Sequence, residues 1–335
     1  MASSPPGSVL ASTVTLLSHV NLNVAALGFV PAAIHFGLIN TLANIEGSAS
    51  GEDVLTAYRS SKGHKAEVDV PCLRLVQDTL CAISGLGFAD TTSDDLYSAN
   101  TIAKLLAAVP PAEHGALHFT AEALLGAAFL MRKLKADNFK YPFKELDTPY
   151  QYAYQLMGQE ELSKQHTYSI MAAEGRLDSF NHFMVGKIMK TSNTPDRLKV
   201  QGYYLQSVLN EAGDASSAIT VDIGGGRGEP LLDIKAAYPE LQASDLAVQA
   251  FNQNIIEVSG VTLATWNYKE ENSPQPKISE LMTPHSRLLI LEFSKNVNYA
   301  KMHSAMIAMY GGRERSAPEW HQMDALAGLV EMRKI

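Results

Sequence analysis

Apolar residues recur at helical spacing through the beginning of the chain. Residues 8–45 show this spacing in the segment AALGFVPAAIHFGLINTLANI, where Pro31 suits the first turn of a second helix. The spacing returns in residues 70–83, VPCLRLVQDTLCAI, and the following SGLGF ends it. Residues 88–100 then read as a short hairpin with Asp94 and Asp95 near its turn. Helix, helix and hairpin is the order of a winged-helix unit.

The pattern changes in the second half of the chain. Residues 100–210 are predicted to be mostly helical, with breaks at Pro110-Pro111 and Pro142. From about residue 215 the order becomes strand, glycine turn, helix and strand, beginning with AITVDIGGGRGEP and continuing through LLDIKAAYP. A second strand is expected at residues 245–251, DLAVQAF. Such a strand, turn and helix form the first βα unit of a nucleotide-binding α/β sheet.

Composition and charge restrict the class of protein. The chain has 335 residues, of which 46% are hydrophobic and 19% charged, with a net charge of −8. This composition is typical of a globular protein with room for two domains. Acids and bases alternate without a basic run, so we expect no nucleic-acid partner. The candidate recognition helix of the winged-helix unit holds only Arg74, which favours dimerisation over DNA binding.

Targeting and metal signals are weak. Cys72 and Cys81 are the only cysteines, and their spacing predicts neither a disulfide framework nor a metal site. The N-terminal MASSPPGSVL has no basic stretch before an apolar core, so we expect no signal peptide. No apolar run reaches the roughly 20 residues that a membrane span needs. The expected location is therefore cytoplasmic, without a membrane partner.

The glycine turn at residues 221–230, VDIGGGRGEP, suggests a particular ligand chemistry. Its spacing is neither G-x-G-x-x-G nor a P-loop, because no G-K-[ST] follows. Glycines allow close approach of the backbone to a ligand, and the following helix offers free N–H groups at its start. Asp222, immediately before the glycines, could accept a hydrogen bond from a ligand ammonium group. A plain tight turn in an α/β sheet is the alternative reading.

The stretch VDIGGGRGEPLLDIKAAYPEL resembles the first motif of the S-adenosylmethionine (SAM) dependent small-molecule O-methyltransferases of plant and fungal secondary metabolism. Further stretches resemble this family in the same order. They are FVPAAIHFGLINTL, LRLVQDTLCAISGLGF, TPYQYAYQLMG, FNHFM, SRLLILEF and MYGGRERSAPEWHQMDALAGL. SRLLILEF, residues 286–293, resembles the fifth strand of the family's sheet. The resemblance covers nearly the whole chain.

The resemblance implies an α/β fold. A C-terminal Rossmann-like SAM-methyltransferase sheet with helices on both faces would follow an all-helical, winged-helix dimerisation domain. The expected domains are residues 1–110 for dimerisation, 111–210 for linker and substrate-pocket helices, and 211–335 for a shortened SAM-binding domain. A homodimer is expected through residues 1 to about 110. The implied cofactor is SAM, and the implied acceptor is an aromatic or polyketide-like secondary metabolite.

The resemblance also implies functional residues. The cofactor-binding set is Asp222, Gly224, Gly226 and Gly228 for the methionine part, with Asn267 and Tyr268 along the adenine. The family ends its second strand with an acid for the ribose. The preferred alignment places Ala250 there, and the sequence leaves open whether Asp245, the only nearby acid, takes that position instead. We therefore expect SAM binding to be weakened. The implied substrate-pocket residues are Phe180, Phe183, Met184, Met302, Met306 and Met309.

One departure from the family concerns the catalytic base. The family has a fourth strand and a helix with the histidine that deprotonates the acceptor, but here Lys277 continues directly into ISELMTPHSRLLI. A second junction of this kind occurs at DALAGLVEMRKI. The catalytic residue is therefore unknown, and His182 and His303 are the candidates for a substitute base.

Three functional readings follow from this departure. The chain is an incomplete form of an active O-methyltransferase, a methyltransferase fold repurposed as a pericyclase or cyclase, or a non-catalytic partner of an intact homologue. The sequence identifies neither the acceptor nor which reading holds. It also leaves open whether the two gaps belong to the functional protein.

Overall fold

The computed structural model describes residues 22–62, 69–185, 193–200, 202–211, 220–226, 228–250, 260–265, 286–290 and 300–326. The chain divides into two compact units. Unit 1 comprises Met1–Gly186 and Ala300–Arg313, and unit 2 comprises Lys187–Tyr299 and Glu314–Ile335. Each unit thus contains segments that are far apart in the sequence.

The N-terminal part of unit 1 combines helices with a small antiparallel sheet. In chain order its elements are α2 (Phe29–His35), α3 (Leu38–Ala43), β1 (Ser48–Ser50), α4 (Gly51–Lys62), α5 (Leu73–Gly85), β2 (Asp90–Ser93) and β3 (Leu96–Ser98). The strands pair in the order β1-β3-β2. The predicted helix at 70–83 and the predicted hairpin are confirmed, with Asp95 in the turn at a φ of 57°. Leu38, Val76 and Leu80 are among the fully buried side chains that close this core.

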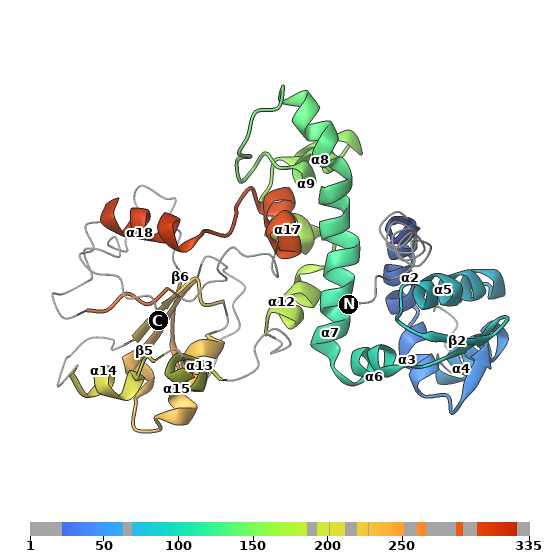
Figure 1. Ribbon diagram of the computed structural model, residues 1–335, viewed down its shortest axis with the longest axis horizontal. Helices are drawn as coiled ribbons and strands as arrows, with labels where there is room; N and C mark the ends of the chain where they lie inside the picture. Colours follow the sequence, from blue (N-terminus) through green and yellow to red (C-terminus); the bar gives the residue numbers. More distant parts are fainter. Residues whose placement is uncertain are drawn as a thin grey trace, which may run out of the picture. The chain divides into compact units, whose positions relative to one another are not determined.

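A long helical rod runs through the middle of unit 1 (Figure 1). After α6 (Thr101–Ala108), the rod consists of α7 (Pro110–His118), the π-helical turn η1 (Phe119–Ala123) and α8 (Leu124–Ala136). Pro110 opens α7 because proline at the first helical position loses no intrahelical hydrogen bond. The π-helical turn is the one irregularity in this continuous rod, and such turns often occur at functional sites.

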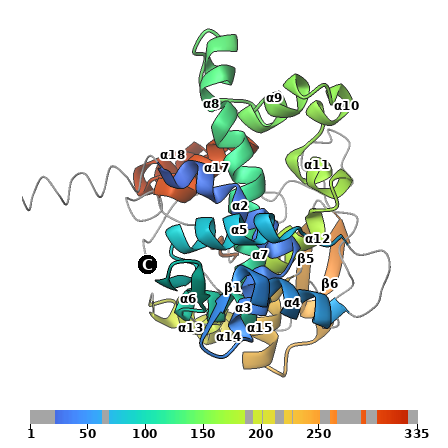
Figure 2. The same cartoon turned by 90° about the vertical axis from the view of Figure 1, so that its right-hand side faces the viewer.

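Helices that follow the rod pack back against it. They are α9 (Pro149–Leu156), α10 (Glu160–Ser163), α11 (Thr167–Ala173) and α12 (Leu177–Val185), joined from the end of the chain by α17 (Ala300–Tyr310). The chain thus packs α9 on α8 and returns to pack α12 on α7 (Figure 2). A side chain at Gly115 would lie 2.7 Å from the Phe183 ring, and one at Gly126 would lie 3.2 Å from the Ala308 carbonyl. Glycine at these two positions therefore lets α12 and α17 approach the rod closely.

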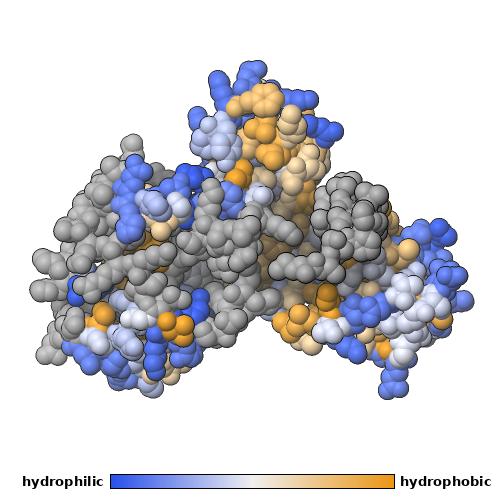
Figure 3. All heavy atoms as spheres, viewed as in Figure 1, coloured by the Kyte–Doolittle hydropathy of each residue, from blue (hydrophilic) through white to orange (hydrophobic). Residues whose placement is uncertain are grey.

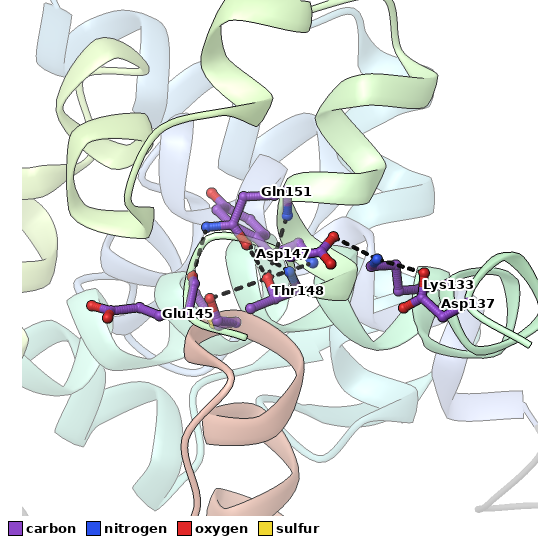
Figure 4. Close-up of polar contacts among 8 residues, drawn as sticks. Lys133, Asp137, Glu145, Asp147, Thr148 and Gln151 are labelled. Carbon is purple, nitrogen blue, oxygen red and sulfur yellow. Dashed lines mark hydrogen bonds and ion pairs between the residues drawn. The ribbon is translucent and has the colours of Figure 1, made fainter. Parts of the chain in front are cut away.

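A buried polar network fixes the C-terminal end of α17 (Figure 4). The carbonyl oxygen of Met309 accepts hydrogen bonds from Thr167 Oγ1 at 2.5 Å and from Thr148 Oγ1 at 3.4 Å. Thr148 caps α9 in a reciprocal capping box with Gln151. Nearby, the buried Lys133 ammonium is paired with Asp137 at 2.8 Å and Asp147 at 2.5 Å. The two hydrogen bonds to the Met309 carbonyl connect α17 to α11 and to the start of α9, although α17 lies more than 120 residues later in the chain.

Unit 2 contains a parallel sheet with the order β4-β5-β6. Its elements are α13 (Thr194–Val200), α14 (Leu205–Glu211), β4 (Thr220–Ile223), α15 (Glu229–Ala237), the 3₁₀ turn η3 (Ala243–Asp245), β5 (Leu246–Ala250), β6 (Thr262–Thr265) and α18 (Ala317–Leu326). Leu231, Ile234, Leu246 and Val248 form its buried core. Over the described residues, β4 and β5 confirm the strand expected before the glycine turn and the strand expected at 245–251, and α15 confirms the helix between them.

One expected strand differs. The segment SRLLILEF was expected to form a strand, but residues 286–290 form no backbone ladder with any described strand, and 291–293 lie outside the described residues. Within the described ranges, no helix combines the length and the hydropathy that crossing a bilayer requires.

Candidate functional site

The glycine turn of unit 2 connects β4 to α15 by way of left-handed backbone. Gly224, Gly226 and Gly228 have φ values of 75°, 58° and 77°, a region that other residues enter at a steric cost. The Gly224 N–H donates to the carbonyl of Gln249 on β5 at 2.7 Å. A Cβ atom on Gly228 would lie 2.6 Å from Val248 Cγ2. These glycines therefore let the turn fold tightly over the ends of two neighbouring strands.

Asp222 contacts the inside of this turn. A Cβ atom on Gly225 would lie 2.2 Å from Asp222 Oδ2, so only glycine leaves room for the carboxylate there. The parallel strands β4 and β5 end beside it, at the edge where ligands bind in open α/β sheets. The turn thus combines a carboxylate, close backbone and the start of a nine-residue helix. This arrangement fits a ligand that carries both an ammonium group and a carboxylate, as the methionine part of SAM does.

The expected ribose position lies at the same edge. Ala250 is the last residue of β5 and pairs with Thr265 of β6. Asp245 lies at the opposite end of β5, in η3, and its Oδ2 accepts the Gln242 N–H at 2.7 Å. Asp245 is therefore engaged as a turn cap away from the ligand edge. Asn267 and Tyr268 lie outside the described residues.

The predicted substrate-pocket residues lie on two helices of unit 1. Phe180, Phe183 and the exposed Met184 are on α12, and Met302, Met306 and Met309 are on α17. Met309 is completely buried beside Tyr150, Tyr154 and Ile170, whereas Met302 and Met306 are half-buried.

Aromatic rings connect the two helices. The Tyr168 ring lies 5.5 Å from Phe180 on one side and 5.5 Å from Tyr310 on the other, measured between ring centroids.

The two histidines considered as substitute bases lie in different settings. His182 is exposed, and its Nδ1–H donates to the Asp178 carbonyl within the same helix at 2.7 Å. His303 is half-buried on α17. Their catalytic role stays a prediction.

A third histidine was not singled out by the sequence. His118 ends α7, and its Nδ1 lies 3.1 Å from Glu122 Oε2 in the π-helical turn, with both side chains only 6% exposed. Arg176 Nε donates to the other oxygen, Glu122 Oε1, at 2.8 Å. The His118 ring lies 4.9 Å from Phe180 and 5.9 Å from Phe183. The signal in the sequence was the i, i+4 pair in HFTAE, which is unremarkable until the fold buries it.

The ion pairs shift the titration of Glu122. Burial opposes ionisation, but the hydrogen bonds from His118 and Arg176 outweigh it and hold the pKa of the Glu122 carboxyl below its ordinary value. Glu122 is therefore a carboxylate at neutral pH. Around it, burial raises the pKa of the Tyr310 phenol well above 10, with smaller contributions from Tyr168 and Glu122.

Two solved structures show that other proteins share this fold. "Crystal structure of OxaC in complex with SAH and oxaline" matches with a TM-score of 0.69 and 14% identity, covering 98% of this chain and 84% of that one. "A Pericyclic Reaction enzyme" matches with a TM-score of 0.68 and 18% identity, covering 93% and 83%. At these identities the likeness shows the fold, which is the α/β fold of such proteins.

Family membership comes from a closer relative. No known family profile matches the chain. The protein "O-methyltransferase bfoE" of Aspergillus brasiliensis is 43% identical over 370 residues, covering 98% of this chain and 96% of that protein. The chain belongs to the O-methyltransferase family that this relative represents, as its motifs indicated.

The length of that alignment bears on the two sequence gaps. An alignment of 370 positions exceeds the 335 residues of this chain, so the relative has at least 35 positions without a counterpart here. The junctions at Lys277 and at DALAGLVEMRKI themselves lie outside the described residues.

Proposed function

We propose that this chain binds SAM at the glycine turn of unit 2 and acts on an aromatic or polyketide-like acceptor held by the helices of unit 1. The observation that supports this proposal most directly is the geometry of the turn. Three glycines with left-handed backbone and the close approach of Gly225 to Asp222 form a cradle that a single Cβ would fill. When bound, SAM supplies an electrophilic methyl group for transfer to an acceptor oxygen. The chain's own contribution is then binding, positioning and control of the acceptor proton.

In the cofactor site, the Asp222 carboxylate accepts from the ammonium group of the ligand, and backbone N–H groups at the start of α15 face its carboxylate. Asn267 and Tyr268 complete the site along the adenine. Ala250 offers no carboxylate to the ribose hydroxyls, and Asp245 is engaged at the other end of β5. Binding is therefore weak but measurable.

Calorimetry with S-adenosylhomocysteine tests this site. Asp222→Ala should weaken binding by roughly tenfold, the loss expected for a charge-assisted hydrogen bond. Asp245→Ala is the matched control, since Asp245 lies in η3 at the end of β5 that faces away from the glycine turn. The affinity of this variant should match that of the wild type. Tight binding that survives Asp222→Ala would show that the turn has another role.

Methyl transfer itself is expected to be slow. A positioned base contributes roughly 10²–10⁴-fold to deprotonation of a phenol, and the family's base is absent from these 335 residues. The rate of methylation of 2-naphthol, followed by mass spectrometry, should rise with pH as hydroxide replaces the base. A bell-shaped profile that is lost in His182→Ala or in His303→Ala would instead identify a substitute base.

A second candidate function is a pericyclic or cyclisation reaction. The structural likeness to a pericyclic reaction enzyme and the missing base both favour it, because such a reaction needs a shaped pocket and no proton abstraction from a phenol. Turnover of a polyene or quinone-methide substrate, with no methyl transfer at any pH, would support this candidate.

The N-terminal part of unit 1 has the element order of a winged-helix unit, and we propose that it forms a homodimer with a second copy. Exposed apolar side chains support this, namely Leu22, Val24, Val70, Leu73, Ile102 and Leu105. Further apolar surface lies over α8, including Met131 (Figure 3). Light scattering should give twice the chain mass at micromolar concentration, and a stable monomer would contradict the proposal. The cytoplasmic location likewise stays a prediction.

A further inference from the structure

The buried His118–Glu122–Arg176 network determines which nitrogen of the histidine is free to accept a hydrogen bond. The Glu122 carboxylate can only accept, so the His118 Nδ1 must carry the proton that it shares with Oε2. In the neutral ring, Nε2 is then an acceptor. Among the described residues, the structure records no hydrogen-bond partner for Nε2. The network thus presents one oriented acceptor in an apolar setting.

The setting of His118 is aromatic on several sides. The rings of Phe119, Phe180 and Phe183 lie 5.4, 4.9 and 5.9 Å from the His118 ring, and Phe180 leads through Tyr168 to Tyr310. Rings on α12, α11 and α17 therefore form one connected series beside the ionic network. Offset and edge-on contacts of this kind are the ones that a flat aromatic ligand would also make.

Tyr310 adds a donor that the fold does not use. Its hydroxyl oxygen is buried, and no partner for it exists in the described part of the chain. A buried hydroxyl without a partner is uncommon in folded proteins and calls for an explanation. Burial also raises the pKa of this phenol, so the group keeps its proton. A donor is therefore present at the far end of the ring series from the acceptor.

We infer that unit 1 holds a recognition site for a hydroxylated aromatic ring, in which His118 Nε2 accepts from a ring hydroxyl and the Tyr310 hydroxyl donates to an oxygen of the ligand. Glu122 and Arg176 are positioning residues that hold the acceptor tautomer of His118. The identification of this ligand as the methyl acceptor rests on the proposed function, but the site itself does not. It selects phenols over their methyl ethers, which means acceptor over methylated product.

Binding of two probes to the full-length chain, without SAM, tests the inference. The probes are 2-naphthol and 2-methoxynaphthalene, in which a methyl group replaces the hydroxyl hydrogen and so removes the donor. The wild type should bind 2-naphthol about 3- to 10-fold more tightly, the range for one buried hydrogen bond. Calorimetry measures both affinities, and the melting temperature of every variant is recorded beside them.

Glu122→Gln is the decisive variant because it keeps the shape of the side chain. Arg176 still requires an acceptor, so it takes the single amide oxygen and turns the NH₂ group toward His118 Nδ1. The histidine must then carry its proton on Nε2, which can no longer accept from a phenol. The preference for 2-naphthol should fall to about 1, whereas Glu161→Gln, in an exposed ion pair with Lys164, should keep it.

Two further variants separate recognition from folding. His118→Phe should also abolish the preference, and the matched exposed change His321→Phe should not. Tyr310→Phe should weaken binding of 2,6-dihydroxynaphthalene by a factor of about 3 and leave 2-naphthol unaffected, because only the dihydroxy probe has a second oxygen for Tyr310 at the far end of the ring series. Its control is Tyr141→Phe at an exposed position.

The outcomes distinguish this inference from the proposed function. A purely structural network would lower melting temperatures but leave the probe preference unchanged in Glu122→Gln, and that result would overturn the inference. Loss of preference together with normal S-adenosylhomocysteine binding would support both proposals. Loss of preference in a chain that binds no S-adenosylhomocysteine would support the phenol site and contradict the methyltransferase proposal.

Discussion

The candidate ligand sites of the two units are formed by different parts of the chain, namely backbone in unit 2 and side chains in unit 1. In unit 2 the candidate cofactor site consists mainly of backbone, with three glycines in left-handed conformations and one carboxylate. In unit 1 the candidate acceptor site consists of side chains, with a buried histidine, glutamate and arginine among aromatic rings. The backbone site depends on the absence of side chains, whereas the side-chain site depends on paired charges. A methyl group added at a glycine of the turn should therefore destabilise unit 2, and removal of a charge from the buried network should destabilise unit 1.

The largest effect is expected from breaking the buried charge network. Arg176→Met removes one partner of the Glu122 carboxylate, which should lower the free energy of unfolding by about 3–5 kcal/mol. Arg74→Met breaks an equivalent Arg Nε–carboxylate pair with Asp78 whose arginine side chain is 80% exposed, and it should cost at most about 0.5 kcal/mol. Urea denaturation of both variants measures the difference. Equal losses would show that burial of the network contributes nothing.

The pH dependence of unit 1 should follow from Glu122. Its folded-state pKa lies below the ordinary 4.5, so its stabilising contribution is complete above pH 4.5 and is lost as the pH falls through the folded pKa. Near neutral pH, Glu122→Gln should cost about 1.5–3 kcal/mol, the range for hydrogen bonds to a charged group. Below pH 4.5 the difference from the wild type should shrink. A difference that grows toward acid would mean that the carboxyl is protonated in the folded state.

The backbone site should respond to a single methyl group. Gly225→Ala places a Cβ 2.2 Å from the Asp222 carboxylate, and the overpacking should cost about 1–3 kcal/mol and weaken S-adenosylhomocysteine binding. Gly85→Ala, in helix α5 with open space around the new Cβ, is the control. It should be neutral or slightly stabilising, because alanine favours helix. Calorimetry and thermal melting of both variants provide the comparison.

The smallest effect is expected where a hydroxyl has no partner. Tyr310→Phe removes a buried group that makes no hydrogen bond with the described residues, so stability should change by less than about 0.5 kcal/mol or rise. Tyr58→Phe removes a hydroxyl that donates to the Asp69 carbonyl at 3.0 Å, and it should cost about 1 kcal/mol. A clear destabilisation by Tyr310→Phe would reveal a partner that the described residues do not include.

Much of the fold could be predicted from patterns that are local in the sequence. The helix at α5, the hairpin of β2 and β3, and the unit of β4, α15 and β5 each follow from residues within about 30 positions. The motif-based assignment to the O-methyltransferases is confirmed by the fungal relative. The domain boundaries, the cofactor residues and the pocket residues stay predictions. The strand expected at 286–293 pairs with no described strand over 286–290, the part that the structure describes, since a strand depends on a distant partner.

The candidate acceptor site shows where sequence patterns stop being sufficient. The local sequence HFTAE does not predict that His118 and Glu122 are buried, because an i, i+4 pair of this kind is usually solvated on a helix surface. The choice of His182 and His303 followed from their place in family motifs, whereas the buried pair of His118 and Glu122 becomes visible only in the fold.

The sequence by itself determined the family, the glycine turn and the order of the elements, because these depend on residue type and local spacing. Tertiary structure decided which polar groups lost their water. It brought Arg176 to Glu122 across 54 positions, and it brought Tyr168 between Phe180 and Tyr310. Burial converts an ordinary ion pair into a strong constraint on a proton and leaves one phenol without a partner. No local pattern encodes that burial, since it arises only when α11, α12 and α17 pack on the rod.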